Sequence, residues 1–119
     1  MVILSIDDSA ATRQFIKNAV DVLGFEFREA ADGREAQAVL QGHEKPVDLI
    51  LLDWNMPVMD GMTFLKRVRT IPDYKGVKIV MCTSESEKRK VLEAMKEGVD
   101  NYIVKPFTPE ALKDKLGLH

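Results

Sequence analysis

The chain has 119 residues, which is enough for one domain with a substantial hydrophobic core. Its 17 Lys and Arg residues against 19 Asp and Glu residues leave a net charge of -2, so bulk charge does not indicate nucleic-acid binding. The single cysteine excludes an internal disulfide, and no apolar stretch approaches the roughly 20 residues that would span a bilayer. We expect one soluble cytoplasmic domain over residues 1–119, with no signal peptide and no membrane partner.

Apolar runs and helical patterns alternate from the first residues onward. Residues 2–6 are nearly all apolar, which is typical of a strand covered on both faces. The spacing of Phe15, Ile16, Ala19, Val20 and Leu23 predicts a helix that ends at Gly24. Residues 25–30 predict a second strand, and their lower hydrophobicity places it at a sheet edge.

The same alternation continues to the end of the chain. The remaining predicted elements are a helix after Gly33, a strand over 48–53, a helix after Gly61, a strand over 77–83, a helix over 86–97, a strand over 101–104 and a helix from Thr108–Glu110. Val91, Leu92 and Met95 share one face of the fourth helix. Five strand–helix units predict an α/β fold, a doubly wound parallel sheet whose strands all end at one edge, where ligands bind.

Side chains that can carry chemistry stand at the ends of four predicted strands. They are Asp7 and Asp8 after the first strand, Asp53 after the third, Thr83 and Ser84 at the fourth, and Lys105 after the fifth. Each alone is a weak signal, because an Asp-Asp-Ser run before a helix is more often a simple cap. Their expected convergence at one edge indicates a site.

The chemistry of these residue types points to phosphoryl transfer. Three clustered carboxylates repel one another and raise each other's pKa unless a cation lies among them. Oxygen ligands from few protein groups are typical of Mg²⁺, which often partners a phosphate. Lys105 and Thr83 supply a positive charge and a hydroxyl for phosphoryl oxygens. Asp53 is then the candidate nucleophile, since carboxylates can form aspartyl-phosphates.

Four motifs resemble the receiver domains of two-component response regulators. They are "SIDDS", "LLDWNMPVMDG", "MCTSE" and "YIVKPF", in the order and spacing of that family and over essentially the whole chain. "DWNMP", "VKPFT" and Tyr102 are most similar to the single-domain chemotaxis members. The resemblance implies a flavodoxin-like (βα)5 fold with strand order 2-1-3-4-5. It also implies a cis Lys105–Pro106 peptide bond.

The resemblance further assigns roles at the site. Asp53 would accept a phosphoryl group from a sensor histidine kinase. Asp8, Asp53 and the backbone carbonyl of Asn55 would bind Mg²⁺ directly, and Asp7 through water. Lys105 would pair with the phosphoryl group, or with Asp53 when that group is absent.

A switch and an output face are implied in the same way. Thr83 would bond the phosphoryl oxygen and Tyr102 would follow it inward. This change would repack the face made by the fourth helix, fifth strand and fifth helix, where a downstream target binds; the flagellar switch is one candidate. Asn55 and Glu85 would tune dephosphorylation. The protein would be a monomeric signalling switch that catalyses only its own phosphorylation and dephosphorylation.

Three alternatives remain open at this level. A phosphatase of the haloacid dehalogenase type also uses a strand-end aspartate, but it needs a second acid two residues on, where this chain has Asn55. A flavodoxin-like electron carrier would need a Ser/Thr/Gly-rich first loop, and Asp7 and Asp8 would repel its phosphate. The chain could also be the receiver part of a longer multidomain regulator.

Trp54 and Cys82 are expected to be packing residues, and Lys88–Lys90 a solvated or docking face.

Overall fold

The computed structural model describes residues 1–42, 45–54, 59–84 and 89–115. The strands are β1 (Val2–Ile6), β2 (Glu26–Ala30), β3 (Leu49–Asp53), β4 (Lys78–Thr83) and β5 (Asn101–Val104). The helices are α1 (Ala10–Val22), α2 (Gly33–Gly42), α3 (Gly61–Thr70), the 3-10 helix η1 (Pro72–Tyr74), α4 (Val91–Lys96) and α5 (Pro109–Lys115). Within the described ranges, no helix has the length and hydrophobicity to cross a membrane.

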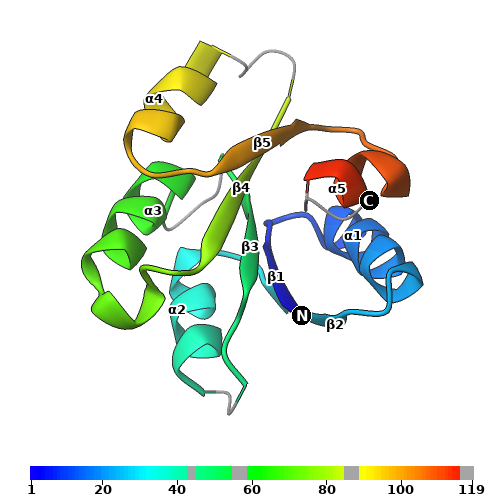
Figure 1. Cartoon of the computed structure of the whole chain (residues 1–119), viewed down its shortest axis with the longest axis horizontal. Coiled ribbons are helices and arrows are strands. Elements are labelled where there is room, and N and C mark those ends of the chain that lie inside the picture. Colours follow the sequence, from blue (N-terminus) through cyan, green and yellow to red (C-terminus); the bar gives the residue numbers. More distant parts are fainter. Residues whose placement is uncertain (43–44, 55–58, 85–88, 116–119) are drawn as a thin grey trace.

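All five strands are parallel and follow the order β2-β1-β3-β4-β5. The predicted doubly wound fold and its strand order are therefore confirmed. Helices α1 and α5 cover one face of the sheet, and α2, α3 and α4 cover the other (Figure 1). The less apolar strand β2 lies at one edge, as its sequence predicts, and β5 forms the opposite edge.

The two faces of the sheet carry separate hydrophobic cores. Alternate residues of β1 belong to different cores. Leu4 and Ile6 pack toward α2, α3 and α4, whereas Ile3 packs toward α1 and α5. In β3 all five residues are buried. This two-sided burial explains why the central strands are continuous apolar runs rather than alternating patterns.

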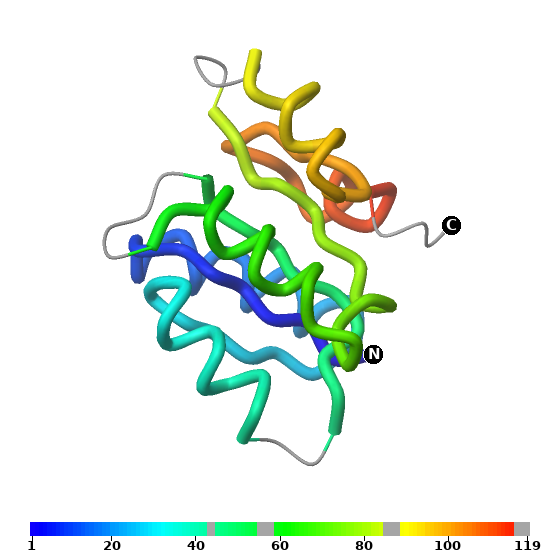
Figure 2. Tube along the Cα trace, turned by 90° about the vertical axis from the view of Figure 1, so that its left-hand side faces the viewer, coloured from blue at the N-terminus to red at the C-terminus, as the bar shows by residue number. Residues whose placement is uncertain are grey.

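The strands deliver their last residues to one side of the molecule. In Figure 2 the traces of β1, β3 and β4 run from right to left, so that their carboxyl ends lie together on the left. Helix caps follow at once: the Ser9 hydroxyl accepts from the Thr12 backbone N–H at 3.2 Å, and an Asp60 carboxylate oxygen accepts from the Thr63 N–H at 2.8 Å. The chain therefore reverses directly behind the strand ends.

Not all apolar residues at helical spacing in the first helix are buried. Phe15 is 43% exposed because the buried face of α1 is centred on Ile16, Ala19 and Val20. Its ring contacts Phe107 edge to face at 5.5 Å between centroids.

The residues expected to share one face of the fourth helix differ in burial. Leu92 is 73% exposed and Met95 46% exposed, because only Val91 and Ala94 turn toward the sheet. Helix α4 begins at Val91, and residues 86–88 of the predicted helix lie outside the described residues. Spacing alone fixes which residues share a face, but not which face meets the sheet.

Candidate functional site

Asp53 is the last residue of β3, and the residue is 5% exposed. It has a cationic partner: Lys105 Nζ donates to Asp53 Oδ1 at 3.1 Å and also to Asp7 Oδ2 at 3.1 Å. Lys105 follows β5, and β4 lies between β5 and β3. One ammonium group thus joins acids from the ends of β1 and β3, and the predicted pairing of Lys105 with Asp53 is confirmed.

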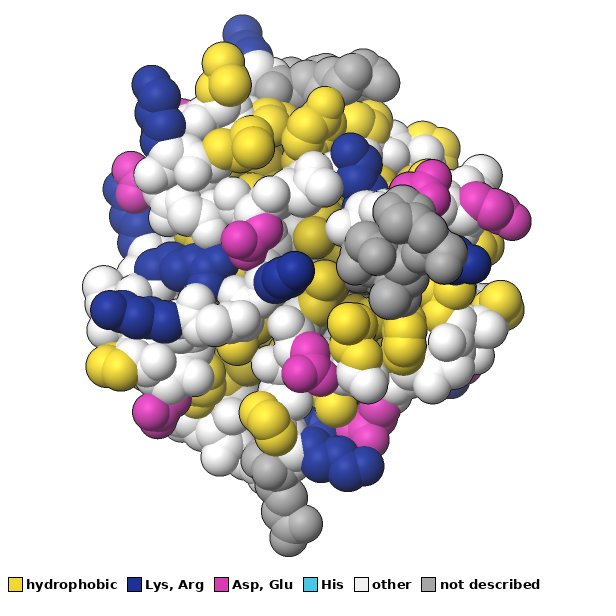
Figure 3. All heavy atoms as spheres, viewed as in Figure 1, with side chains coloured by type: hydrophobic (Ala, Val, Ile, Leu, Met, Phe, Trp, Pro, Cys, Tyr) yellow, Lys and Arg dark blue, Asp and Glu magenta, His cyan; other side chains and the backbone are white. Residues whose placement is uncertain are grey.

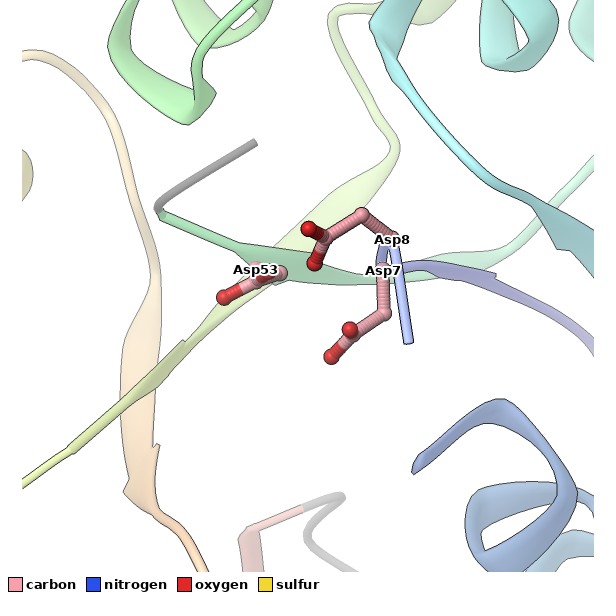
Figure 4. Close-up of side chains that lie close together, drawn as sticks. All are labelled: Asp7, Asp8 and Asp53. Carbon is pink, nitrogen blue, oxygen red and sulfur yellow. The ribbon is translucent and has the colours of Figure 1, made fainter. Parts of the chain in front are cut away.

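Asp7, Asp8 and Asp53 form a compact group of carboxylates. Each offers an oxygen that lies within 4.8 Å of the others. Figure 4 shows Asp7 and Asp8 at the end of β1 extending toward the space beside Asp53. Asp7 and Asp53 are buried, whereas Asp8 is exposed, so the group opens to solvent on the Asp8 side. A donor set made only of oxygens fits a hard divalent cation, and these residues could hold one.

The electrostatics of the site follow from this crowding. Burial is the largest cause that raises the pKa of Asp53 to about 6, and the negative charge of Asp7 raises it further, while Lys105 acts in the opposite direction. For Lys105, burial would lower the pKa of the ammonium, but Asp53 and Asp7 outweigh burial and raise it. The ammonium is therefore charged at neutral pH. The buried position of Asp53, in contrast, destabilises the charged form of its carboxyl group.

Sequence reasoning missed a further residue of the site, Arg13. Its Nη1 donates to the backbone carbonyl of Asp7 at 2.5 Å, and its Nε donates to Glu29 Oε1 at 2.7 Å. The Asp7 side chain also accepts from the Ser9 N–H at 2.9 Å. Together these bonds fix the turn that carries Asp7 and Asp8. The only signal in the sequence is an arginine five residues after Asp8, which alone indicates no more than a surface residue.

Thr83 and Tyr102 lie on neighbouring strands. Thr83 is fully buried at the end of β4, and its hydroxyl donates to the Ser84 carbonyl at 3.2 Å. The register pairs Thr83 with Val104 and Met81 with Tyr102, so Tyr102 stands two positions back from the strand ends. It packs against the same core as Met81. Asn55 and Glu85, the other two expected site residues, lie outside the described residues.

Trp54 and Gly61 close the side of the site behind Asp53. Trp54 is 6% exposed and belongs to the core, which confirms the packing role expected for it. Gly61 donates from its N–H to the Trp54 carbonyl at 3.2 Å, and a Cβ at this position would lie 2.7 Å from the indole ring and 2.9 Å from the Asp53 carbonyl. Only glycine fits this approach of α3 to the end of β3.

Two remaining expectations are also met. Cys82 is buried, and burial raises the pKa of its thiol to about 12, so it is a neutral packing group rather than a nucleophile. The Lys105–Pro106 peptide bond is cis, as the resemblance implied.

Known proteins match the chain over nearly its full length. Residues 3–117 match the response regulator receiver domain family. Chemotaxis protein CheY1 of Helicobacter pylori is 44% identical over 98% of this chain and 94% of its own length. The CheY homolog of Campylobacter jejuni is 45% identical over 98% of this chain and 89% of its own length.

A solved structure agrees with these relatives. The chemotaxis response regulator CheY4 of Vibrio cholerae superposes with a TM-score of 0.88 at 40% identity, covering 98% of this chain and 95% of that one. These relatives are signalling regulators, and none of them supports a phosphatase of the haloacid dehalogenase type. The chain belongs to the family of response regulator receiver domains, and within it resembles the CheY-type chemotaxis regulators.

Proposed function

We propose that residues 1–119 form one receiver domain that acts as a phospho-accepting switch in a two-component, chemotaxis-type pathway. Asp53 accepts a phosphoryl group from a sensor histidine kinase. The observation that carries the proposal is the placement of Asp53: a buried carboxylate at the end of β3, bonded by Lys105 and flanked by Asp7 and Asp8. The protein acts on no other substrate and works in the cytoplasm as a monomer.

The chain's own residues account for most of the transfer. A carboxylate oxygen of Asp53 forms a bond to phosphorus, the bond from phosphorus to the donor's imidazole nitrogen breaks, and that nitrogen keeps the electron pair. The Lys105 ammonium lies 3.1 Å from Asp53 Oδ1. After transfer, it is placed to donate to a negatively charged phosphoryl oxygen. Asp7, Asp8, Asp53 and the carbonyl of Asn55 would hold Mg²⁺, which neutralises phosphoryl charge when bound.

The metal assignment is tested with the Asp8→Ala variant. The wild-type protein, given Mg²⁺ and acetyl phosphate, is expected to gain one phosphoryl group, located on Asp53 by mass spectrometry. The variant is expected to bind Mg²⁺ at least about tenfold more weakly, because it loses a direct ligand. Fluorescence of Trp54, the only tryptophan, reports the binding. Asp114→Ala, at an exposed acid on α5, is the charge-matched control. Unchanged Mg²⁺ affinity in Asp8→Ala would show that the metal site is misplaced.

The output face is proposed to be the surface of α4, β5 and α5, which a downstream protein target reads. Exposed hydrophobic side chains support this: Leu92 and Met95 of α4 reach solvent, and Figure 3 shows hydrophobic side chains at the surface around the α4 end of the molecule. Arg89, exposed just before α4, adds positive charge. Since similar relatives are chemotaxis proteins, the flagellar switch is the first target to test.

Thr83 and Tyr102 are proposed to connect Asp53 to that face. A Thr83→Ala variant is expected to accept phosphate on Asp53, yet to lose the movement of Tyr102 and the accompanying gain in target affinity. Target binding before and after beryllofluoride treatment measures the coupling. Val104→Ala, at the residue paired with Thr83 in β5, controls for lost packing. Full activation of phosphorylated Thr83→Ala would place the coupling elsewhere.

Asn55 and Glu85 are proposed to tune dephosphorylation, as the family resemblance implies. Their short or polar side chains can hold the attacking water beside the phosphoryl group. The decay rate of the phosphoprotein, measured after donor removal in variants at each position, tests this role. Equal decay rates in both variants and in the wild type would exclude it.

A further inference from the structure

Tyr102 has a cationic neighbour on another element. Lys115 Nζ lies 4.7 Å from the centroid of the Tyr102 ring. Tyr102 is on the edge strand β5 and packs against the core that faces α2, α3 and α4, whereas Lys115 ends the described part of α5, on the opposite face of the sheet. The lysine side chain therefore reaches the ring around the open edge of the sheet.

The contact has the geometry of a cation–π interaction, which needs the ammonium within about 6 Å of the ring centroid. Lys115 is partly buried, while Lys113, two residues earlier in the same helix, is exposed. Burying part of the Lys115 stem removes water from the ring and strengthens its attraction for the ammonium. The two lysines thus differ in surroundings although they carry the same charge.

The direction of α5 decides what movement of the ring does to this contact. Helix α5 starts at Pro109, after the carboxyl end of β5, and its last residue, Lys115, contacts Tyr102 near the amino end of β5. Thr83 pairs instead with Val104, the last residue of β5. Thr83 stands two register positions beyond Tyr102, which is about 6.6 Å along the strands. A ring that moves toward Thr83 therefore moves away from the Lys115 ammonium and loses it.

We propose that Lys115 is a positioning residue that holds the Tyr102 ring in its resting position and thereby restrains the switch in the unphosphorylated protein. This inference rests on the proposed switch function and extends it to a residue of α5. A contact present in one of two states stabilises that state alone. Removing it shifts the ring toward Thr83 before any phosphoryl group arrives, and by linkage makes the activated state easier to reach.

The test uses fluorotyrosine-labelled protein and fluorine NMR. The chain has two tyrosines, so Tyr74 in η1 serves as the internal reference. In Lys115→Met, which keeps a long stem without the charge, the Tyr102 resonance is expected to move toward its beryllofluoride-treated position. The expected change is about threefold in the ratio of the two ring positions. Lys115→Arg keeps a cation over the ring and is expected to stay near wild type, and Lys113→Met is the matched control.

The outcomes separate this proposal from the function on which it rests. If Asp53 takes the adduct but Lys115→Met leaves the Tyr102 resonance at its wild-type position, the restraint is refuted and the function stands. An equal shift in Lys113→Met also refutes it, because net charge would then be the cause. If Asp53 takes no adduct, the function fails. The contact itself is still tested in unmodified protein: ring-current shifts of the Lys115 side-chain protons are expected, and their persistence in Tyr102→Leu would overturn it.

Discussion

Replacing Asp53 with asparagine is expected to abolish phosphoryl incorporation from both acetyl phosphate and a histidine kinase. Asparagine is nearly isosteric with aspartate, so β3 and the packing behind it should persist. The amide, however, has no charged oxygen to attack phosphorus. Among the described carboxylates, Lys105 binds one besides Asp53 at the end of a central strand, which is that of Asp7. Intact-mass spectrometry after incubation with Mg²⁺ and donor gives the stoichiometry.

Asp7 supplies the matched control for that experiment, because it shares the Lys105 ammonium at the same distance of 3.1 Å. An Asp7→Asn variant is expected to phosphorylate slowly but still on Asp53. Peptide mapping of the wild-type adduct must place the phosphoryl group on residue 53. Stoichiometric phosphorylation of Asp53→Asn would show that another residue is the acceptor.

The sheet and the convergence of acids on its edge could be predicted because they depend on short-range patterns. A run such as Leu49–Leu52 has no polar face, so it can only be a strand or helix covered on both sides, and the turn residues around it make it a strand. Once the strands are parallel, their ends must meet. The roles proposed for Lys105 and Thr83 needed the family resemblance, since a lone lysine or threonine carries little information.

Other features could not be read from one sequence because they depend on contacts between distant segments. The Arg13 bond to the Asp7 carbonyl exists only because α1 turns back beside β1 and β2. The Lys115–Tyr102 contact joins the edge strand β5, whose Tyr102 side chain packs on one face of the sheet, to helix α5 on the other face. The exposure of Leu92 could not be predicted for the related reason that periodicity does not reveal how a helix is rotated about its axis.

The Asp53→Asn substitution is also expected to stabilise the fold at neutral pH in the absence of metal. Burial and the charge of Asp7 raise the pKa of Asp53 from an ordinary value of 3.8 to about 6 in the folded protein. A raised carboxyl pKa means that the folded state binds the proton more tightly than the unfolded chain does. Between these two pH values the unfolded state loses the proton first, so the contribution of Asp53 to stability falls as the pH rises through this window.

Above about pH 6 the folded protein bears the full cost of the ionised, buried Asp53. The pKa difference corresponds to about 3 kcal/mol of unfolding free energy. Because Lys105 loses one partner in Asp53→Asn while keeping Asp7, we expect the variant to be more stable than wild type by about 2 kcal/mol at neutral pH. The two proteins should converge below about pH 3, under both pKa values, where Asp53 is protonated in the folded and the unfolded state. Urea unfolding across this range measures the difference, with Asp114→Asn as the exposed control.

Saturating Mg²⁺ should remove the advantage of the variant, since a cation bound to Asp53 stabilises the charged carboxylate. A difference that does not change between about pH 4 and neutral pH would show that the gain comes from packing and not from the buried charge of Asp53.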